Sequence, residues 1–273
     1  MKILVTGASG FIGNALSQSL SERYEVICMS RTNPQLDLRW IQGNFGSFED
    51  LRQLDGDNVE AVVHLAAVTG RGTEYECLSV NALGTRNLMK YLIDKGCNKF
   101  IMASSIAVIG LQDIKFRPLQ LPIPDEHPCL DSHGYGFSKY MMEEITKYYH
   151  RRNPAIDVIN LRLAVVCPDD AMPPKVTVSP IKEWTLASLS VLPLSQAIRV
   201  FTLAIRAEHK SGVRIMNVAP RKSWTQVPVK DILTNWWNDD IDLSYYDNPE
   251  NKYASLFDTR FVERELGFMA DDV

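Results

Sequence analysis

A tyrosine and a lysine four residues apart are the first residues whose types and spacing could do chemistry. The stretch "YGFSK" places Tyr135 and Lys139 one turn apart on any helix that contains them. A free tyrosine titrates near pKa ~10 and exchanges protons poorly at neutral pH. A nearby ammonium group favours the phenolate and lowers that pKa, which predicts a proton-transfer pair. The alternative is two ordinary residues on a solvated helix, and the spacing alone does not decide between them.

A glycine-rich stretch near the start of the chain offers a second chemistry, the binding of phosphate. "TGASGFIG" places Gly7, Gly10 and Gly13 between an apolar run and a helical pattern. These glycines permit a tight turn, a close approach of the backbone to a pyrophosphate, and close packing of helix on strand. The amino end of the helix adds free N–H groups and a positive dipole end. The stretch therefore predicts a dinucleotide-binding loop.

The segments around these residues alternate between strand and helix patterns. Short apolar runs, typical of strands buried on both faces, occupy 2–7, 25–30, 40–45, 61–67, 100–105 and 157–163. Helical spacing is clearest in 11–23, 81–96 and 135–152. The alternation predicts an α/β protein with a Rossmann-type, doubly wound parallel sheet. Ser105 ends the fifth strand and so lies at the carboxyl edge, where such sheets bind ligands.

The pattern changes after about residue 166. A proline-rich stretch without a clean period comes first, and two helical runs (194–208 and 228–237) and a short strand (213–219) follow. We predict a dinucleotide-binding domain with the catalytic residues over 1–166. Residues 167–273 are predicted to form a small substrate-binding lobe that is interleaved with the sheet and is not an independent domain.

Composition narrows the class of protein. The 273 residues are 45% hydrophobic and 23% charged, and the net charge of −4 argues against nucleic acid or an anionic membrane as a partner. No apolar stretch reaches the ~18 residues that a membrane span needs. The five cysteines are scattered, which predicts neither a disulfide framework nor a metal site, and His64 is interpreted as a packed core histidine. The amino end lacks a signal-peptide pattern, so a cytoplasmic protein is expected.

Several motifs, in order, resemble the extended short-chain dehydrogenase/reductase superfamily, the NAD-dependent epimerase/dehydratase family. They are "TGASGFIG", "HLAA", "NALGTRNL", "SSIAVIG", "YGFSK", "LRLAVVCP" and "FDTRFVERELGF", and the likeness is good over about residues 2–168. The resemblance implies that Tyr135 is the general acid/base, that Lys139 is its electrostatic partner and holds the nicotinamide ribose, and that Ser105 orients the substrate oxygen. It also implies the cofactor contacts Gly7, Ser9, Gly10, Phe11, Ile12, Gly13, Ser30, Arg31, Asn44, Phe45, Leu65, Ala66, Ala67, Asn81, Tyr135 and Lys139.

The end of the second strand indicates which nucleotide binds. An acidic residue there would accept hydrogen bonds from the ribose 2′-hydroxyl and repel a 2′-phosphate. The chain instead has Ser30 and Arg31. A guanidinium group can pair with a 2′-phosphate and stack on adenine. We therefore predict NADP(H) as the preferred cofactor, with NAD(H) possible and with Asn44 and Phe45 flanking the adenine.

The substrate lobe departs from the nucleotide-sugar enzymes of the family that it resembles. Val165 stands where those enzymes usually carry asparagine, and "SLSVLPLSQ" lacks their diphosphate-gripping arginine. The predicted substrate contacts are Thr69, Ser105, Ile106, Lys175 and Lys182, of which the two lysines could bind a carboxylate or phosphate. The main hypothesis is NADPH-dependent reduction of a keto group on a sugar or sugar nucleotide. The alternative is a UDP-glucose 4-epimerase-like enzyme that retains NAD, and a non-catalytic NADP sensor is disfavoured by the complete Ser105, Tyr135 and Lys139 set.

Two helices carry more apolar residues than one buried face needs. These residues are Leu83, Leu88 and Leu92 in 81–96, and Tyr140, Met141, Ile145 and Tyr148 in 135–152. The family resemblance implies that both helices pair across a two-fold axis. We therefore expect a homodimer.

Overall fold

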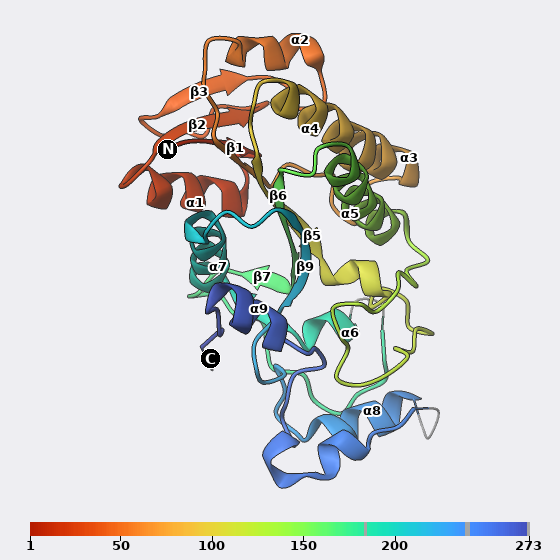
Figure 1. Ribbon diagram of the computed structural model, residues 1–273. Coiled ribbons are helices and arrows are strands. Elements are labelled where there is room, and N and C mark those ends of the chain that lie inside the picture. The colour runs from red at the N-terminus through yellow and green to blue at the C-terminus, as the bar shows by residue number, and fades with distance from the viewer. Residues whose placement is uncertain (183–184, 238–240, 272–273) are drawn as a thin grey trace.

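A seven-stranded parallel sheet forms the centre of the computed structural model, which describes residues 1–182, 185–237 and 241–271 (Figure 1). Its order is β3-β2-β1-β4-β5-β6-β9, and every neighbouring pair is parallel. The strands are β1 (Lys2–Thr6), β2 (Glu25–Ser30), β3 (Arg39–Gln42), β4 (Ala61–His64), β5 (Lys99–Ser105), β6 (Asp157–Leu163) and β9 (Gly212–Val218). The predicted Rossmann-type, doubly wound α/β fold is confirmed.

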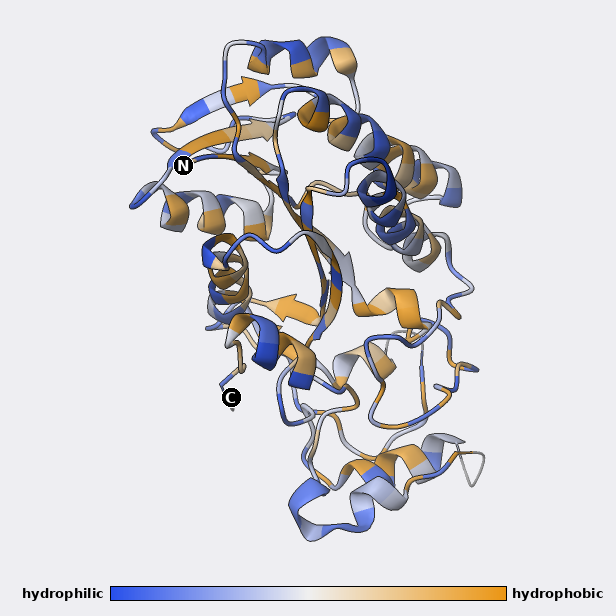
Figure 2. Ribbon diagram, in the orientation of Figure 1, coloured by the Kyte–Doolittle hydropathy of each residue, from blue (hydrophilic) through white to orange (hydrophobic). Residues whose placement is uncertain are grey.

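Helices cover both faces of this sheet. In Figure 1, α1 (Phe11–Ser21), α7 (Leu194–Arg206) and α9 (Arg260–Leu266) lie on one face, and α2 (Phe48–Leu51), α4 (Thr85–Asp94) and α5 (Gly134–Arg152) lie on the other. Two apolar cores result, and consecutive residues of β1 alternate between them. The apolar helix stripes that face the sheet are visible in Figure 2.

The helix expected over 81–96 begins seven residues earlier than its pattern predicted. α3 (Glu74–Cys77), a π-helical segment η2 (Leu78–Gly84) and α4 follow one another without a break. Thr73 starts the run with a capping box, because its hydroxyl accepts the Glu76 N–H while the Glu76 carboxylate accepts the Thr73 N–H. Most residues of this first turn are exposed and follow no apolar periodicity, so the sequence pattern did not predict the turn.

The carboxyl-terminal third of the chain contributes to the sheet as well as to a separate lobe. β9 pairs with β6 and α7 covers the sheet, while β7 (Val165–Cys167) and β8 (Val191–Pro193) form a two-stranded sheet of their own. α6 (Thr185–Ser188), α8 (Val229–Trp237) and the short helices η4 (Ser244–Asp247) and η5 (Pro249–Asn251) complete the lobe. Short 3₁₀ turns η1 (Arg52–Leu54) and η3 (Ile106–Ile109) follow α2 and β5. Within the described residues, no helix is long and apolar enough to cross a membrane.

The apolar residues noted on the two helices differ in their exposure. Leu88 and Leu92 are buried in the core beneath α4, so they form the inward face of that helix. Leu83 and Tyr148 are 57% and 41% exposed, so their apolar surface has no cover within the described part of the chain. Only the outward residues of η2 and α5 therefore bear on assembly.

Candidate active site

A cavity of about 970 Å³ lies over the carboxyl ends of the central strands. One end is formed by the glycine loop between β1 and α1, and the other by the end of β5 and the first turn of α5. Its lining includes every predicted cofactor residue except Asn81, together with the predicted substrate residues Thr69, Ser105 and Ile106. The fold therefore brings segments spread over more than half of the chain to a single site.

The glycine loop forms a cradle with no room for side chains. Gly7 has a φ of +71°, and its N–H donates to Met29 O at 2.9 Å, which turns the chain sharply after β1. A Cβ on Gly13 would lie 2.1 Å from Gly7 O. Gly10 caps α1 without a side-chain hydrogen bond, so the first N–H groups of the helix stay available beside the cavity. These features fit a dinucleotide pyrophosphate, which needs close backbone approach and N–H donors.

The charged side chains that line the cavity are cationic. Of the described lining residues none is acidic, and Arg31 and Lys139 carry the positive charge. Arg31 follows β2, where Thr32 donates a hydrogen bond to Ser9 Oγ at 2.9 Å and so ties this turn to the glycine loop. The turn after β2 thus lies beside the phosphate cradle, as expected for the adenosine end of a dinucleotide.

Ser105, Tyr135 and Lys139 meet at the far end of the cavity. Lys139 Nζ lies 5.9 Å from the centre of the Tyr135 ring and donates to Ala103 O at 2.8 Å. Burial lowers the pKa of Lys139 to about 8, although the charge of Glu143 opposes that shift. Burial raises the pKa of Tyr135, and its hydrogen bond with Ser105 only partly offsets this.

The direction of the Tyr135 shift corrects one expectation. The sequence predicted a lowered pKa from the neighbouring ammonium group together with a nicotinamide cation. In the protein alone the pKa of Tyr135 is raised, because desolvation of the phenolate outweighs the hydrogen bond with Ser105. Tyr135 therefore carries its proton at neutral pH. That state suits a general acid that protonates a forming alkoxide.

Asn81 lies behind the cavity wall and joins two of its segments. Its side-chain amide accepts from Val68 N and donates to Val68 O, both at 2.8 Å, and it donates to Ser138 Oγ at 2.9 Å. Ser138 in turn donates to Tyr135 O at 2.7 Å. Val68 lines the cavity whereas Asn81 does not. The contacts of Asn81 are thus with the loop after β4 and with the helix that carries Tyr135.

His64 is a core residue, as interpreted from the sequence. Its side chain is 2% exposed, and its ring nitrogens lie 2.7 Å from Thr6 Oγ1 and 3.0 Å from Thr85 Oγ1. Burial first, and then the charge of Lys139, lowers the pKa of His64 to about 3. The ring therefore stays neutral and links β1, β4 and α4 beneath the cavity.

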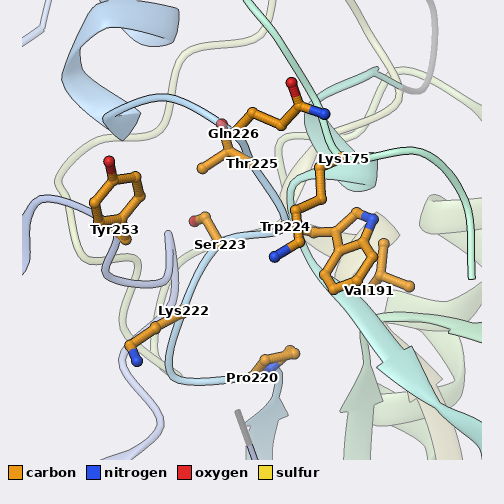
Figure 3. A pocket seen from close by; sticks show the side chains of 9 residues that line it. All are labelled: Lys175, Val191, Pro220, Lys222, Ser223, Trp224, Thr225, Gln226 and Tyr253. Atoms are coloured by element: carbon orange, nitrogen blue, oxygen red, sulfur yellow. The ribbon is translucent and has the colours of Figure 1, made fainter. Parts of the chain in front are cut away.

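The two lysines predicted to bind substrate lie away from the cavity that holds Tyr135. Lys182 is exposed and is not part of the described lining. Lys175 belongs to a second pocket of about 420 Å³ in the carboxyl-terminal lobe (Figure 3), where its Nζ lies 4.6 Å from the centre of the Trp224 ring. Lys222, Gln226 and Tyr253 line the same pocket. Val165 and its strand partner Val191 line the first and the second pocket respectively, so the β7–β8 pair separates the two.

Several lining residues had no motif to reveal them. Gln112 is 2% exposed, lines the large cavity two residues after Gly110, and donates from Nε2 to Asp131 at 3.0 Å. Thr32 also lines it and directly follows the predicted cofactor residue Arg31. Ala164 lines it too; it lies inside the quoted stretch "LRLAVVCP" but was given no role. The position of Gln112, by contrast, depends on the path of the loop after η3.

The fold and the cavity together define a dinucleotide-binding α/β protein with a serine, a tyrosine and a lysine at the far end of its cofactor cleft. The family model described as "NAD dependent epimerase/dehydratase family" matches residues 3–176. The chain belongs to this family.

Individual relatives place the chain near nucleotide-sugar enzymes. It is 28% identical over 191 residues to a UDP-glucose 4-epimerase of Caenorhabditis elegans (59% of this chain, 53% of the relative). It is 33% identical over 155 residues to a GDP-6-deoxy-D-talose 4-dehydrogenase of Aggregatibacter actinomycetemcomitans (55% and 48%). The chain thus spans about half the length of the curated relatives that it matches.

Solved structures share the fold over the whole chain. The UDP-glucose 4-epimerase of Bifidobacterium longum in complex with NAD+ and UDP has a TM-score of 0.75 at 18% identity, covering 100% of this chain and 94% of that one. A short-chain dehydrogenase/reductase superfamily protein of Agrobacterium tumefaciens with bound NAD has a TM-score of 0.74 at 17% identity, covering 100% and 93%. At these identities the likeness establishes the fold alone.

Proposed function

We propose that this protein moves hydride between a nicotinamide cofactor and a secondary carbon of a nucleotide-linked sugar, in the manner of a 4-epimerase. The observation that carries the proposal is the convergence of Ser105, Tyr135 and Lys139 on one cavity that begins at a phosphate-binding glycine loop. The curated relatives named as 4-epimerases support this alternative more than they support the reductase that the sequence favoured.

Ser105, Tyr135 and Lys139 have different roles in this reaction. A bound nicotinamide ring would take up and return the hydride. As hydride leaves the substrate carbon, Tyr135 in its phenolate form takes the proton of the substrate hydroxyl, and as hydride returns, the phenol gives that proton back to the forming alkoxide. Ser105 holds the substrate oxygen through its hydroxyl. Lys139 places a positive charge beside the phenol, which stabilises the phenolate that forms when the proton leaves. The cavity of about 970 Å³ is at the upper end of the ordinary range for ligand sites, which suits a dinucleotide with a sugar beside it.

The second pocket supports a substrate that carries phosphate. Lys175 and Lys222 bring two positive charges to it, and Trp224 and Tyr253 add aromatic surface (Figure 3). Lysine ammonium groups bind phosphate as point charges, and aromatic rings can stack on a base. A substrate that spans the β7–β8 pair could place its sugar near Tyr135 and its nucleotide in this pocket.

Retention of the cofactor tests the proposal. A 4-epimerase returns its hydride in each cycle, so the purified protein should release NAD(H) or NADP(H) when denatured. It should also interconvert UDP-glucose and UDP-galactose, or another epimer pair from a panel of nucleotide sugars, without added cofactor. Tyr135→Phe serves as the inactive control. Absence of epimerisation across the panel, with a cofactor-loaded protein, would refute this function.

An NADPH-dependent ketoreductase is the second candidate, and Arg31 favours it. The cation after β2 and the lack of an acidic residue among the described lining suit the 2′-phosphate of NADP(H). A reductase must release NADP+ after each turnover, so it would be purified largely free of cofactor. It would consume NADPH in proportion to product when given keto-sugars or keto-sugar nucleotides, which the epimerase reaction would not do.

A further inference from the structure

A buried ion pair lies directly behind the catalytic end of the cavity. Glu143 on α5 is fully buried, and both of its carboxylate oxygens accept from Arg162 on β6, at 2.9 Å from Nε and 2.8 Å from Nη2. Ser104 donates to the same carboxylate at 2.6 Å. Ser104 and Arg162 are direct partners in the pairing of β5 with β6. The pair therefore joins α5 to the two strands that adjoin the site.

Glu143 is also one helical turn from Lys139. The four-residue spacing puts both side chains on the same face of α5, the face that packs on β5. Lys139 is 4% exposed and its ammonium group bonds to Ala103 O, the residue before Ser104. A buried ammonium group loses hydration and tends to release its proton unless a negative charge stands nearby.

The other titratable groups that face Lys139 do not supply such a charge at neutral pH. The ring of His64 is neutral, because burial and then the charge of Lys139 lower its pKa to about 3. Burial raises the pKa of Cys77 and that of Tyr135, so both keep their protons. Glu143 remains, ion-paired with Arg162. Among the described groups that act on Lys139, Glu143 favours the ammonium form most strongly.

We propose that Glu143 is a positioning residue of the active site, whose buried carboxylate keeps Lys139 protonated while Arg162 and Ser104 hold that carboxylate in place. Glu143 does not line the cavity and touches no reacting atom. Its role deepens the proposed function and rests on it for the catalytic consequence, but the charge state of Lys139 can be measured without any substrate.

The test measures the protonation midpoint of Lys139 directly. Protein labelled with ¹³C at the lysine ε carbon is titrated by NMR from about pH 4 to about pH 11, a range that spans a buried and a free lysine. The Lys139 signal is identified by its loss in Lys139→Met. In the unmutated protein it should titrate near pH 8. In Glu143→Gln the midpoint should fall by about 1–3 pH units, the range for loss of one close opposite charge.

Arg162→Lys is the matched control. It breaks the same two-bond pair and disturbs the same packing, but it keeps a cation beside the carboxylate, so Glu143 stays charged and the Lys139 midpoint should stay near its original value. If Glu143→Gln does not fold, the double variant Glu143→Gln/Arg162→Met removes both charges and should still lower the midpoint, since neutral replacements of buried pairs are often tolerated. An unchanged midpoint in the folded variants without Glu143, or an equal fall in Arg162→Lys, would overturn the proposal.

If the protein converts a nucleotide sugar from the panel described above, the pH dependence of turnover provides a second readout. Glu143→Gln should lose activity relative to the unmutated protein as the pH rises past its own lysine midpoint, and should recover at acidic pH. Arg162→Lys should show no such recovery. A panel without any active substrate would count against the proposed function and would leave the NMR result standing.

Discussion

Gly13→Ala provides a direct test of the glycine cradle. The added Cβ would lie 2.1 Å from Gly7 O, 2.8 Å from Gly7 C and 3.0 Å from Ala8 Cα, whereas ordinary contact begins at 3.4 Å. All three are backbone atoms, so no side chain can rotate away. The amino end of α1 must move from the end of β1 by roughly 1 Å, and overpacking of this kind costs about 1–3 kcal/mol.

Two measurements should register that displacement. The melting temperature of the protein without added ligand should fall by roughly 2–12 °C, from a few degrees per kcal/mol in a chain of this size. The affinity for NADPH and NADH, followed by fluorescence titration, should fall at least about tenfold, because the N–H groups that face the pyrophosphate move with the helix. Both effects come from the same contact, so they should appear together.

Gly56→Ala is the matched control. A Cβ at Gly56 would meet nothing within 4 Å, and the residue has no left-handed φ. Its substitution should change stability by no more than about 0.5 kcal/mol and leave both cofactor affinities unchanged. If Gly13→Ala bound cofactor and melted as Gly56→Ala does, the loop would not be the tight cradle that its backbone indicates.

Three further predictions concern chemistry, cofactor choice and assembly. Tyr135→Phe keeps the ring but removes the proton-bearing oxygen, so turnover should fall by about 10²–10⁴ with little change in cofactor affinity, as steady-state kinetics and NADPH titration would show. NADPH should bind more tightly than NADH, and Arg31→Asp should reverse the order by about tenfold to hundredfold; equal dissociation constants in the unmutated protein would contradict this. Light scattering should give a dimer mass at micromolar concentration, and Leu83→Glu, at a side chain that is 57% exposed, should give a monomer mass without a lower melting temperature.

The sheet was predictable because each central strand has its own signal in the sequence. A strand buried on both faces is largely apolar, and β1, β4 and β5 each contain an unbroken apolar run, at 3–5, 61–63 and 100–103. The order of the first six strands, β3-β2-β1-β4-β5-β6, is the usual one for a doubly wound dinucleotide-binding sheet. β7 and β8 had no comparable signal, because each has three residues and they pair across more than twenty intervening residues.

The first turn of the long helix shows a different limit. The sequence marks the start of this helix with Thr73 and Glu76, which form a capping box. A search for apolar spacing does not detect a capping box. The π-helical segment that follows had no such marker. A π turn adds a residue to the ordinary helical repeat and so changes which side chains face the core. Asn81 lies in that segment and is buried there.

The site was predictable where short motifs fix both residue type and element. The glycine loop, the end of β5 and the start of α5 are such places, and their residues line one cavity. Lys175 was expected in a loop over the same site, but it lines the second pocket together with Val191 of β8. The sequence does not determine the path of a long connection without periodicity, so the residue type alone could not predict where Lys175 lies.

Asn81 shows how motifs far apart in the sequence act as one unit. Its amide holds both the N–H and the C=O of Val68, in the loop after β4, and reaches Ser138 on α5. The backbone oxygen of Tyr135 accepts from that same serine. The loop after β4 is therefore tied, through one buried amide, to the helix turn that carries Tyr135. A residue outside the described cavity lining can in this way help to fix the position of the proton-bearing side chain.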